Sequence, residues 1–87
     1  MLIVLPSDPT TMKASAWLKG RGVNHRMIRI PDSLGYRTTA TIALYLPDAT
    51  HTDAKTMMMD FSAEGFVIMR IFQDYHLDED CTNGNPP

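Results

Sequence analysis

The stretch from residue 23 to residue 46 decides the fold: it reads VNHRMIRI over 23–30, PDSLGYRTT over 31–39 and ATIALYL over 40–46. Aliphatic residues recur in the outer two segments, although neither face of 24–30 is cleanly apolar, whereas the middle segment holds Pro, Asp, Ser and Gly, which favour turns. The pattern therefore predicts two strands joined by a polar loop. Alternate apolar residues in the second strand predict a core face that consists of Ala40, Ile42, Leu44 and Leu46. We expect that strand to be central and residues 24–30 to form an edge strand.

A strand and a helix are expected before this hairpin. The apolar run MLIVL at residues 1–5 is typical of a short buried strand. Asp8 and Pro9 then indicate a helix start, with Asp8 as the N-cap, and the helix should run to about Lys19. The glycines at 20 and 22 should end it, because glycine adopts the left-handed cap conformation at little cost.

A second helix and a last strand are expected after the hairpin. Thr50 is the candidate N-cap of this helix, and Gly65 should end it. Its apolar residues recur at helical spacing and predict a buried stripe of Ala54, Met57, Met58 and Phe61. Residues 66–72 then read as a strand that is apolar on both faces.

This order of elements predicts an α+β fold of the ferredoxin-like βαββαβ type, a two-layer α/β sandwich. The four strands should form one antiparallel sheet with two helices on one face. We expect a single domain at residues 1–73, followed by an acidic, mobile tail at residues 74–87. The sheet face without helices should be open and apolar, which predicts a homodimer. Its candidate interface residues are Tyr45, Phe66, Ile68 and Phe72.

Composition restricts the class of protein. The chain has 87 residues, a formal net charge of −2 and one cysteine. A single cysteine excludes an internal disulfide and a cysteine-based metal cage, and it favours a cytoplasmic location. No apolar run is long enough to cross a membrane. An acidic chain without aromatic residues in its first strand also argues against nucleic-acid binding.

The polar loop is the candidate binding site. Its side chains and those beside it include a carboxylate, several hydroxyls and two guanidinium groups: Arg29, Asp32, Ser33, Tyr36, Arg37, Thr38 and Thr39. Arg37 with the Ser33 and Thr38 hydroxyls could hold a carboxylate or a phosphate, because a guanidinium binds such anions through two parallel hydrogen bonds. The alternative is an ordinary connection whose hydroxyls satisfy the turn itself.

No motif predicts catalysis, a metal or a cofactor. His25, His51 and His76 lie on different elements and are expected to be surface residues rather than metal ligands. The acidic set around Cys81 could bind a cation weakly, but a disordered solvated tail is the stronger interpretation. The negative charges beside Cys81 disfavour its reactive thiolate.

Residues 11–46 resemble the small selenium/sulfur carrier-like proteins, a family of unknown function, and the spacing fits without a gap over residues 11–31. The matching segments are Met12-Lys13-Ala14, Trp17-Leu18-Lys19, Gly22-Val23, Arg26-Met27-Ile28 and Ile30-Pro31. The resemblance implies a carrier whose Cys-Gly pair would fall near Thr38 and Thr39. This chain has no cysteine there, and a hydroxyl cannot form a persulfide.

We therefore expect a non-enzymatic binding or accessory module, a degenerate relative of that family, whose partner is another protein or a small anionic ligand. The alternative is a sulfur-transfer carrier or a small enzyme that uses Cys81 or the Arg37 loop.

Overall fold

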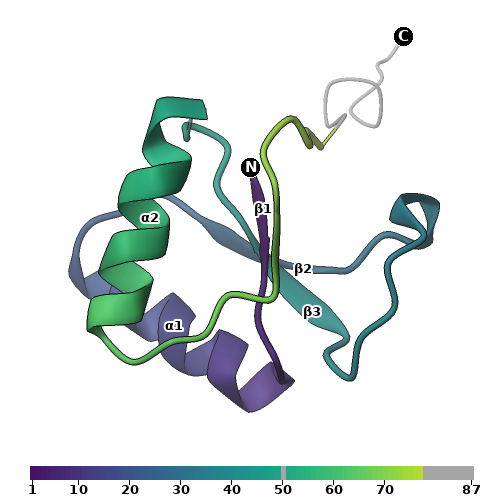
Figure 1. Cartoon of the computed structure of the whole chain (residues 1–87), viewed down its shortest axis with the longest axis horizontal. Helices are drawn as coiled ribbons and strands as arrows, with labels where there is room; N and C mark the ends of the chain where they lie inside the picture. Colours follow the sequence, from purple (N-terminus) through teal and green to yellow (C-terminus); the bar gives the residue numbers. More distant parts are fainter. Residues whose placement is uncertain (50, 78–87) are drawn as a thin grey trace, which may run out of the picture.

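The structure is a computed structural model that describes residues 1–49 and 51–77. Its elements in chain order are β1 (Leu2–Val4), α1 (Asp8–Gly20), β2 (Arg26–Arg29), the 3₁₀ helix η1 (Asp32–Leu34), β3 (Ile42–Tyr45), α2 (His51–Ala63) and β4 (Arg70–Phe72). The strands form one sheet in the order β2-β3-β1-β4, and every neighbouring pair is antiparallel (Figure 1). The predicted ferredoxin-like α+β fold is confirmed, with β3 central and β2 at an edge.

Both helices pack on the same face of the sheet. The core between them and the sheet contains Ile3 of β1, Leu44 of β3, Leu18 of α1 and Phe61 of α2, each almost fully buried. The Phe61 ring meets the Trp17 ring edge-on at 5.1 Å between centroids, which joins the two helices. Alternate residues of β1 and β3 thus form an apolar layer on the helix side of the sheet, as the sequence predicts.

The start of α1 differs from the expectation. Ser7, not Asp8, is the N-cap, and its hydroxyl accepts a hydrogen bond from the backbone N–H of Thr10. The Asp8 carboxylate instead accepts hydrogen bonds from residues 41 and 42 at the start of β3. The prediction of Asp8 as N-cap is wrong, because its carboxylate binds these two backbone N–H groups instead of those in the first turn of α1.

The predicted glycine ends of both helices are confirmed. Gly22 and Gly65 have φ angles of +73° and +84°, in the left-handed region. The next residue in each case donates its N–H back into the last helical turn, from Val23 to Leu18 at 3.0 Å and from residue 66 to residue 61 at 2.8 Å. Thr50, the expected N-cap of α2, lies outside the described residues.

The buried stripe of α2 is narrower than expected. Ala54 and Phe61 are buried and Met57 packs against the core, but the Met58 side chain is 53% exposed. Met58 is absent from the residues that pack against the helix-side core, so it lies outside the buried stripe.

The last strand is shorter than predicted, and its apolar residues do not share one face. β4 begins only at Arg70, and Phe66 and Ile68 pack against the helix-side core. Phe72 and Tyr45 belong to a separate cluster on the other side of the sheet. The expectation that these four residues form one common surface is therefore wrong.

The sheet face without helices, called here the second face, is covered by the chain itself. Its buried residues are Leu2, Val4, Ile30, Ala40, Ala43 and Tyr45. Ala40, expected on the helix-side core, thus lies on this face because the chain bends before β3 begins at Ile42. Leu34 and Tyr36 from the loop and Tyr75 and Leu77 from the end of the described chain pack over it. An open face for pairing two copies is not what the structure has.

The packed part of the chain extends beyond residue 73. The Leu77 backbone N–H donates to the Tyr45 hydroxyl at 3.0 Å, and the Met1 amino group donates to the Tyr75 carbonyl at 3.1 Å. Residues 74–77, which the sequence assigns to the tail, are thus part of the domain. The rest of the expected tail, with Cys81, lies outside the described residues.

Candidate functional site

The loop between β2 and β3 has a defined path. It enters η1, and the Gly35 N–H closes that turn on the Asp32 carbonyl at 3.0 Å. Gly35 has a φ angle of +64°, a left-handed conformation that side-chain-bearing residues rarely adopt. The glycine therefore reverses the chain here and sends residues 36–39 back toward the sheet.

Tyr36 attaches the middle of the loop to the second face. Its ring meets the Phe72 ring edge-on, with centroids 5.8 Å apart. The Arg70 guanidinium lies over both rings, 4.9 Å from the Phe72 centroid and 5.9 Å from the Tyr36 centroid. Tyr36 is thus a packing residue as well as a residue of the predicted site.

The far end of the loop is attached to the connection between β1 and α1. The Thr39 hydroxyl donates to the Pro6 carbonyl at 2.7 Å. The Asp8 carboxylate accepts from the Thr41 hydroxyl at 2.5 Å, from the Thr41 N–H at 2.7 Å and from the Ile42 N–H at 3.1 Å. These hydrogen bonds hold the pKa of Asp8 below its usual value, because each of them favours the charged carboxylate.

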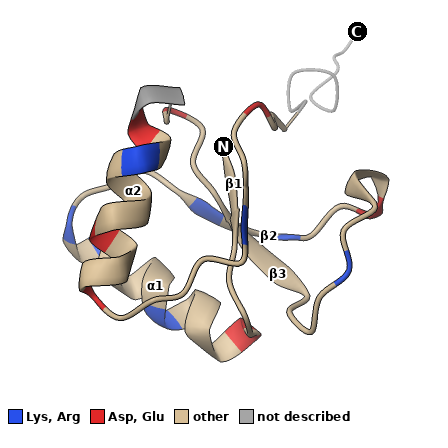
Figure 2. Cartoon of the chain, viewed as in Figure 1, with Lys and Arg blue, Asp and Glu red and all other residues tan. Residues whose placement is uncertain are grey.

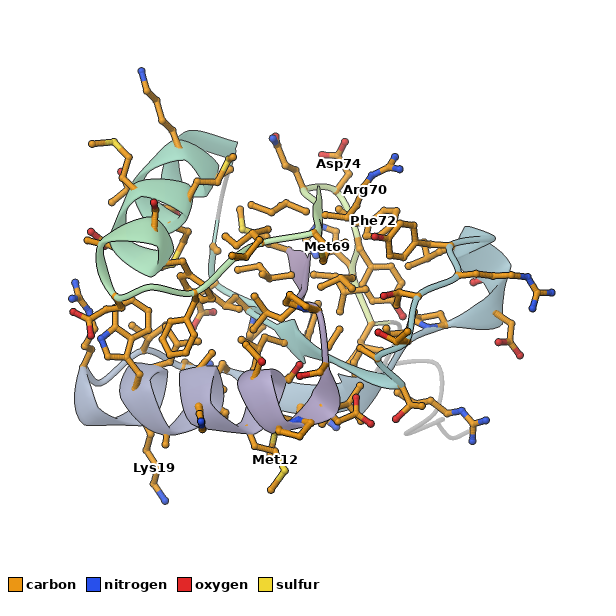
Figure 3. All side chains as sticks on the ribbon, turned by 60° about the horizontal axis from the view of Figure 1, so that its bottom comes forward. Met12, Lys19, Met69, Arg70, Phe72 and Asp74 are labelled. Atoms are coloured by element: carbon orange, nitrogen blue, oxygen red, sulfur yellow. The ribbon has the colours of Figure 1, made fainter. Side chains whose placement is uncertain are left out.

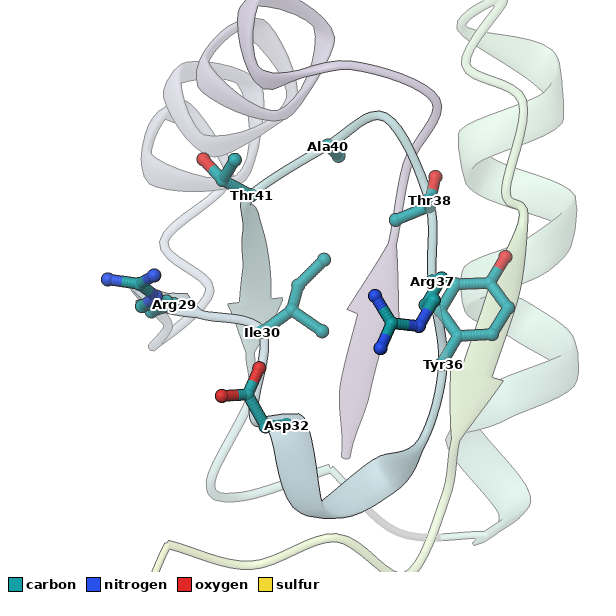
Figure 4. Close-up of a pocket in the computed structure, with 8 residues that line it drawn as sticks. All are labelled: Arg29, Ile30, Asp32, Tyr36, Arg37, Thr38, Ala40 and Thr41. Atoms are coloured by element: carbon teal, nitrogen blue, oxygen red, sulfur yellow. The ribbon is translucent and has the colours of Figure 1, made fainter.

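A cavity of about 200 Å³ lies between the loop and the edge of the sheet. Eight residues line it: Arg29, Ile30, Asp32, Tyr36, Arg37, Thr38, Ala40 and Thr41 (Figure 4). The structure therefore brings together five of the seven residues that the sequence predicts for this site. The other two, Ser33 and Thr39, do not line the cavity; Ser33 is exposed, and Thr39 bonds to Pro6.

The two arginines occupy different positions around the cavity. In Figure 4 the Arg37 guanidinium points into the hollow that the loop encloses, whereas Arg29 lies at the rim and points outward. Arg29 also lines an adjoining hollow of about 350 Å³ together with Thr41 and Ile42. Arg37 is therefore the central cation of the site, and Arg29 stands where the two hollows meet.

Neither guanidinium is neutralised within the described part of the chain. Among residues 1–49 and 51–77, Arg29 and Arg37 make no ion pair or hydrogen bond through their side chains. Asp32 lines the same cavity on the side that faces Arg37, yet these two side chains form no ion pair (Figure 4). The space between them can hold a ligand.

Side chains of both charges surround the loop. Figure 2 shows Lys and Arg on β2, on β4 and on the loop after η1, and acidic residues on η1, at the start of α1 and on α2. Residues 1–37 hold six Lys or Arg against two Asp, whereas residues 38–87 hold two against eight Asp or Glu. The cations at the cavity itself are Arg29 and Arg37, which can attract an anionic ligand although Asp32 lies beside them.

The histidines do not form a site with the loop. His25 is half-buried: its Nδ1 donates to the Val23 carbonyl at 2.9 Å, and its Nε2 pairs with the Ser15 hydroxyl at 2.6 Å. Sequence reasoning missed this contact, because residues ten positions apart on a helix and before a strand give no local signal. His76 is exposed, and the His51 side chain is not among those described. Within the described ranges, no three His, Cys, Asp or Glu side chains gather as a metal site requires.

Neither α1 nor α2, as far as their residues are described, combines the length and apolar character of a membrane-crossing helix. Comparison with protein-family models, with curated proteins and with solved structures finds no match to this chain. The resemblance to the selenium/sulfur carrier-like proteins accordingly stays a prediction from the sequence.

Proposed function

We propose that this protein is a non-catalytic binding module that recognises a small ligand bearing a carboxylate or a phosphate group. The observation that supports the proposal most is the Arg37 guanidinium, which points into the loop cavity with no partner among the described residues (Figure 4). A charged side chain without a partner at a cavity is suited to bind an external counter-ion.

The position of Arg37 favours recognition. Tyr36 on one side packs against Phe72, and Thr39 on the other side bonds to Pro6, so the backbone that carries Arg37 is fixed at two points. A ligand then has to order the arginine side chain but not the loop, which lowers the entropic cost of binding. The planar guanidinium can donate two parallel hydrogen bonds to one anionic group.

Asp32 narrows the class of ligand. Its carboxylate faces Arg37 across the cavity and would repel an anion that offers only acceptors. A ligand that also carries a hydroxyl or ammonium group could donate to Asp32 while its anionic group binds Arg37. Dihydrogen phosphate, which carries both kinds of group, is therefore a suitable first probe, followed by hydroxy acids and amino acids.

Calorimetric titration of inorganic phosphate at low ionic strength tests the proposal. Arg37→Gln should weaken binding by about tenfold, because a hydrogen bond to a charged group contributes about 1.5 kcal/mol or more. Arg29→Gln should weaken it less, since Arg29 lies at the rim and points outward. Added salt should weaken wild-type binding through screening.

Lys19→Gln is the matched control. Lys19 is exposed in the last turn of α1 and points away from the body of the protein (Figure 3), so this variant removes one positive charge far from the loop. Equal loss of affinity in Arg37→Gln and Lys19→Gln would show only a general charge effect. Unchanged affinity in Arg37→Gln would rule out the proposed site.

We also propose that the protein is cytoplasmic and that it forms a homodimer. Tyr45 is only 5% exposed, so two copies could not pair through it as the sequence suggested. Exposed Met58, Met59 and Val67 offer apolar surface elsewhere. The mass of the protein in solution at low micromolar concentration tests self-association, and a mass equal to one chain would exclude it.

A further inference from the structure

A second hollow adjoins the arginine cavity at the edge of the sheet. It measures about 350 Å³ and is lined by Arg29, Thr41 and Ile42. Arg29 and Thr41 also line the cavity, so the two hollows meet at these two residues. Figure 4 shows Arg29 and Arg37 on opposite sides of the cavity. The cavity and the adjoining hollow, called here the recess, therefore have one guanidinium group in each part.

The cavity alone is small for a ligand site. Pockets that bind small molecules usually measure about 300–1,000 Å³. The cavity, at about 200 Å³, falls below this range, whereas the recess reaches it, because the adjoining hollow alone measures about 350 Å³. A single small anion bound to Arg37 would leave the part at Arg29 unfilled. The volumes therefore favour a ligand that extends from one arginine to the other.

The charged side chains that line the recess are two cations, Arg29 and Arg37, and one anion, Asp32. Neither guanidinium group forms an ion pair or a side-chain hydrogen bond with a residue of the ranges 1–49 and 51–77. Asp8 lines neither part, and its carboxylate accepts hydrogen bonds from the backbone N–H groups of residues 41 and 42. The recess thus offers two cations to acceptor groups of a ligand and one carboxylate to a donor group.

The number and kind of these charges restrict the ligand. A ligand with one anionic group satisfies only one of the two cations. Two carboxylates on a short chain satisfy both, and a hydroxyl between them can donate to Asp32. Two phosphate groups would bring about three to four negative charges to a recess whose side chains sum to one positive charge, whereas two carboxylates bring only two. The charge balance therefore favours carboxylates.

We propose that the recess binds a small hydroxy-dicarboxylate, with one carboxylate on Arg37, the other on Arg29 and the hydroxyl donating to Asp32. This inference rests on the anion site proposed above and names the class of its ligand. The whole protein has a formal net charge of −2, which disfavours unspecific binding of a dianion. A preference for a dianion therefore has to come from the two arginines.

Three acids that differ by single groups test the proposal in calorimetric titrations at about pH 7. Malate has two carboxylates and a hydroxyl, lactate lacks the second carboxylate, and succinate lacks the hydroxyl. Wild type should bind malate about fivefold more tightly than lactate, which is the gain from one exposed ion pair. Arg29→Gln should remove this difference, and Arg37→Gln should weaken the binding of both acids. Lys19→Gln should keep the difference, because Lys19 points away from the protein (Figure 3).

Asp32→Asn tests the role of the hydroxyl. The amide carries no charge, so this variant no longer repels an acid that offers only acceptors. Succinate should therefore gain affinity, and the preference of wild type for malate over succinate should shrink. An unchanged preference would overturn the hydrogen bond assigned to Asp32.

NMR of the wild-type protein supplies a readout that needs no variant. The side-chain Nε–H signals of Arg29 and Arg37 should both shift on addition of malate, whereas lactate should shift that of Arg37 alone. A malate-induced shift at Arg37 alone would overturn the inference and leave the anion site in place.

The affinities separate this inference from the proposed function. Equal affinities of wild type for malate and lactate, or a preference for malate that survives in Arg29→Gln, would overturn the inference while binding through Arg37 stands. Binding of phosphate without binding of either acid would have the same meaning. If malate, lactate and phosphate all fail to bind, the proposed function fails and this inference fails with it.

Discussion

Tyr45→Phe tests whether the second face is covered by residues 74–77. The substitution keeps the ring, which meets the Tyr75 ring edge-on at 5.9 Å, and removes only the hydroxyl that accepts from the Leu77 N–H at 3.0 Å. The Leu77 N–H is half-buried and would be left without this acceptor. The net loss for one such hydrogen bond is about 1 kcal/mol of unfolding free energy.

Urea denaturation measures the loss. With a slope of about 1–2 kcal/mol per molar, typical of a small chain, the midpoint should fall by about 0.5–1 M. The melting temperature should fall by about 4–8 °C. Amide hydrogen exchange adds local information, because the Leu77 N–H should lose its protection while the amides of β1 and β3 keep most of theirs.

Tyr36→Phe is the matched control. The Tyr36 hydroxyl makes no hydrogen bond among the described residues, so its removal should change stability by less than about 0.5 kcal/mol. Two results would refute the reasoning: equal midpoints for the two variants, or a Leu77 amide that exchanges in wild type as fast as in an unfolded peptide. Either would mean that the second face is open, and the predicted pairing of two copies through that face would regain its basis.

Three further predictions concern the framework that holds the loop. Asp8→Asn should lower the urea midpoint at about pH 7. Because the folded-state pKa of Asp8 is depressed, its contribution is present above the usual carboxyl pKa and is lost as pH falls through the folded value, so the gap to wild type should narrow as the pH falls below the usual carboxyl pKa and close once Asp8 is protonated in the folded protein. Gly22→Ala should cost about 1 kcal/mol because of its left-handed φ, whereas Gly20→Ala, in the last helical position and with open space around it, should stabilise by about 0.5 kcal/mol; opposite shifts in melting temperature check both. Phe61→Ala should cost about 3–5 kcal/mol in chemical denaturation, since the ring is fully buried against Trp17, and a loss below about 1 kcal/mol would contradict that packing.

The order of elements was predictable because each one carries a local signal. Helical spacing places Phe61 toward the sheet, and Gly22 and Gly65 end their helices where the pattern stops. The location of the candidate site was predictable for the same reason, since residues 31–39 interrupt two apolar strands. Local signals therefore identified both the sheet and the loop from which Arg37 projects.

The covering of the second face had no local signal. Tyr36 contacts Phe72 and Tyr75 contacts Tyr45, pairs separated by some thirty residues or more in the sequence. Tyr36 and Tyr75 each lie in a polar segment, and an aromatic residue there was the available hint that the segment packs back onto the domain. Because the sequence does not reveal these two long-range contacts, it predicted an open second face and a domain that ends at residue 73.

The polar residues of the loop have different roles in the structure. Sequence reasoning grouped Ser33, Thr38 and Thr39 with Arg37 as ligand-binding residues, yet Thr39 bonds to Pro6 and Ser33 lies outside the cavity. The Thr39 hydroxyl and the Tyr36 ring fix the backbone, and Arg37 between them is the group available to a ligand. A loop built in this way suits recognition, because the backbone that carries the cation is fixed before the ligand binds.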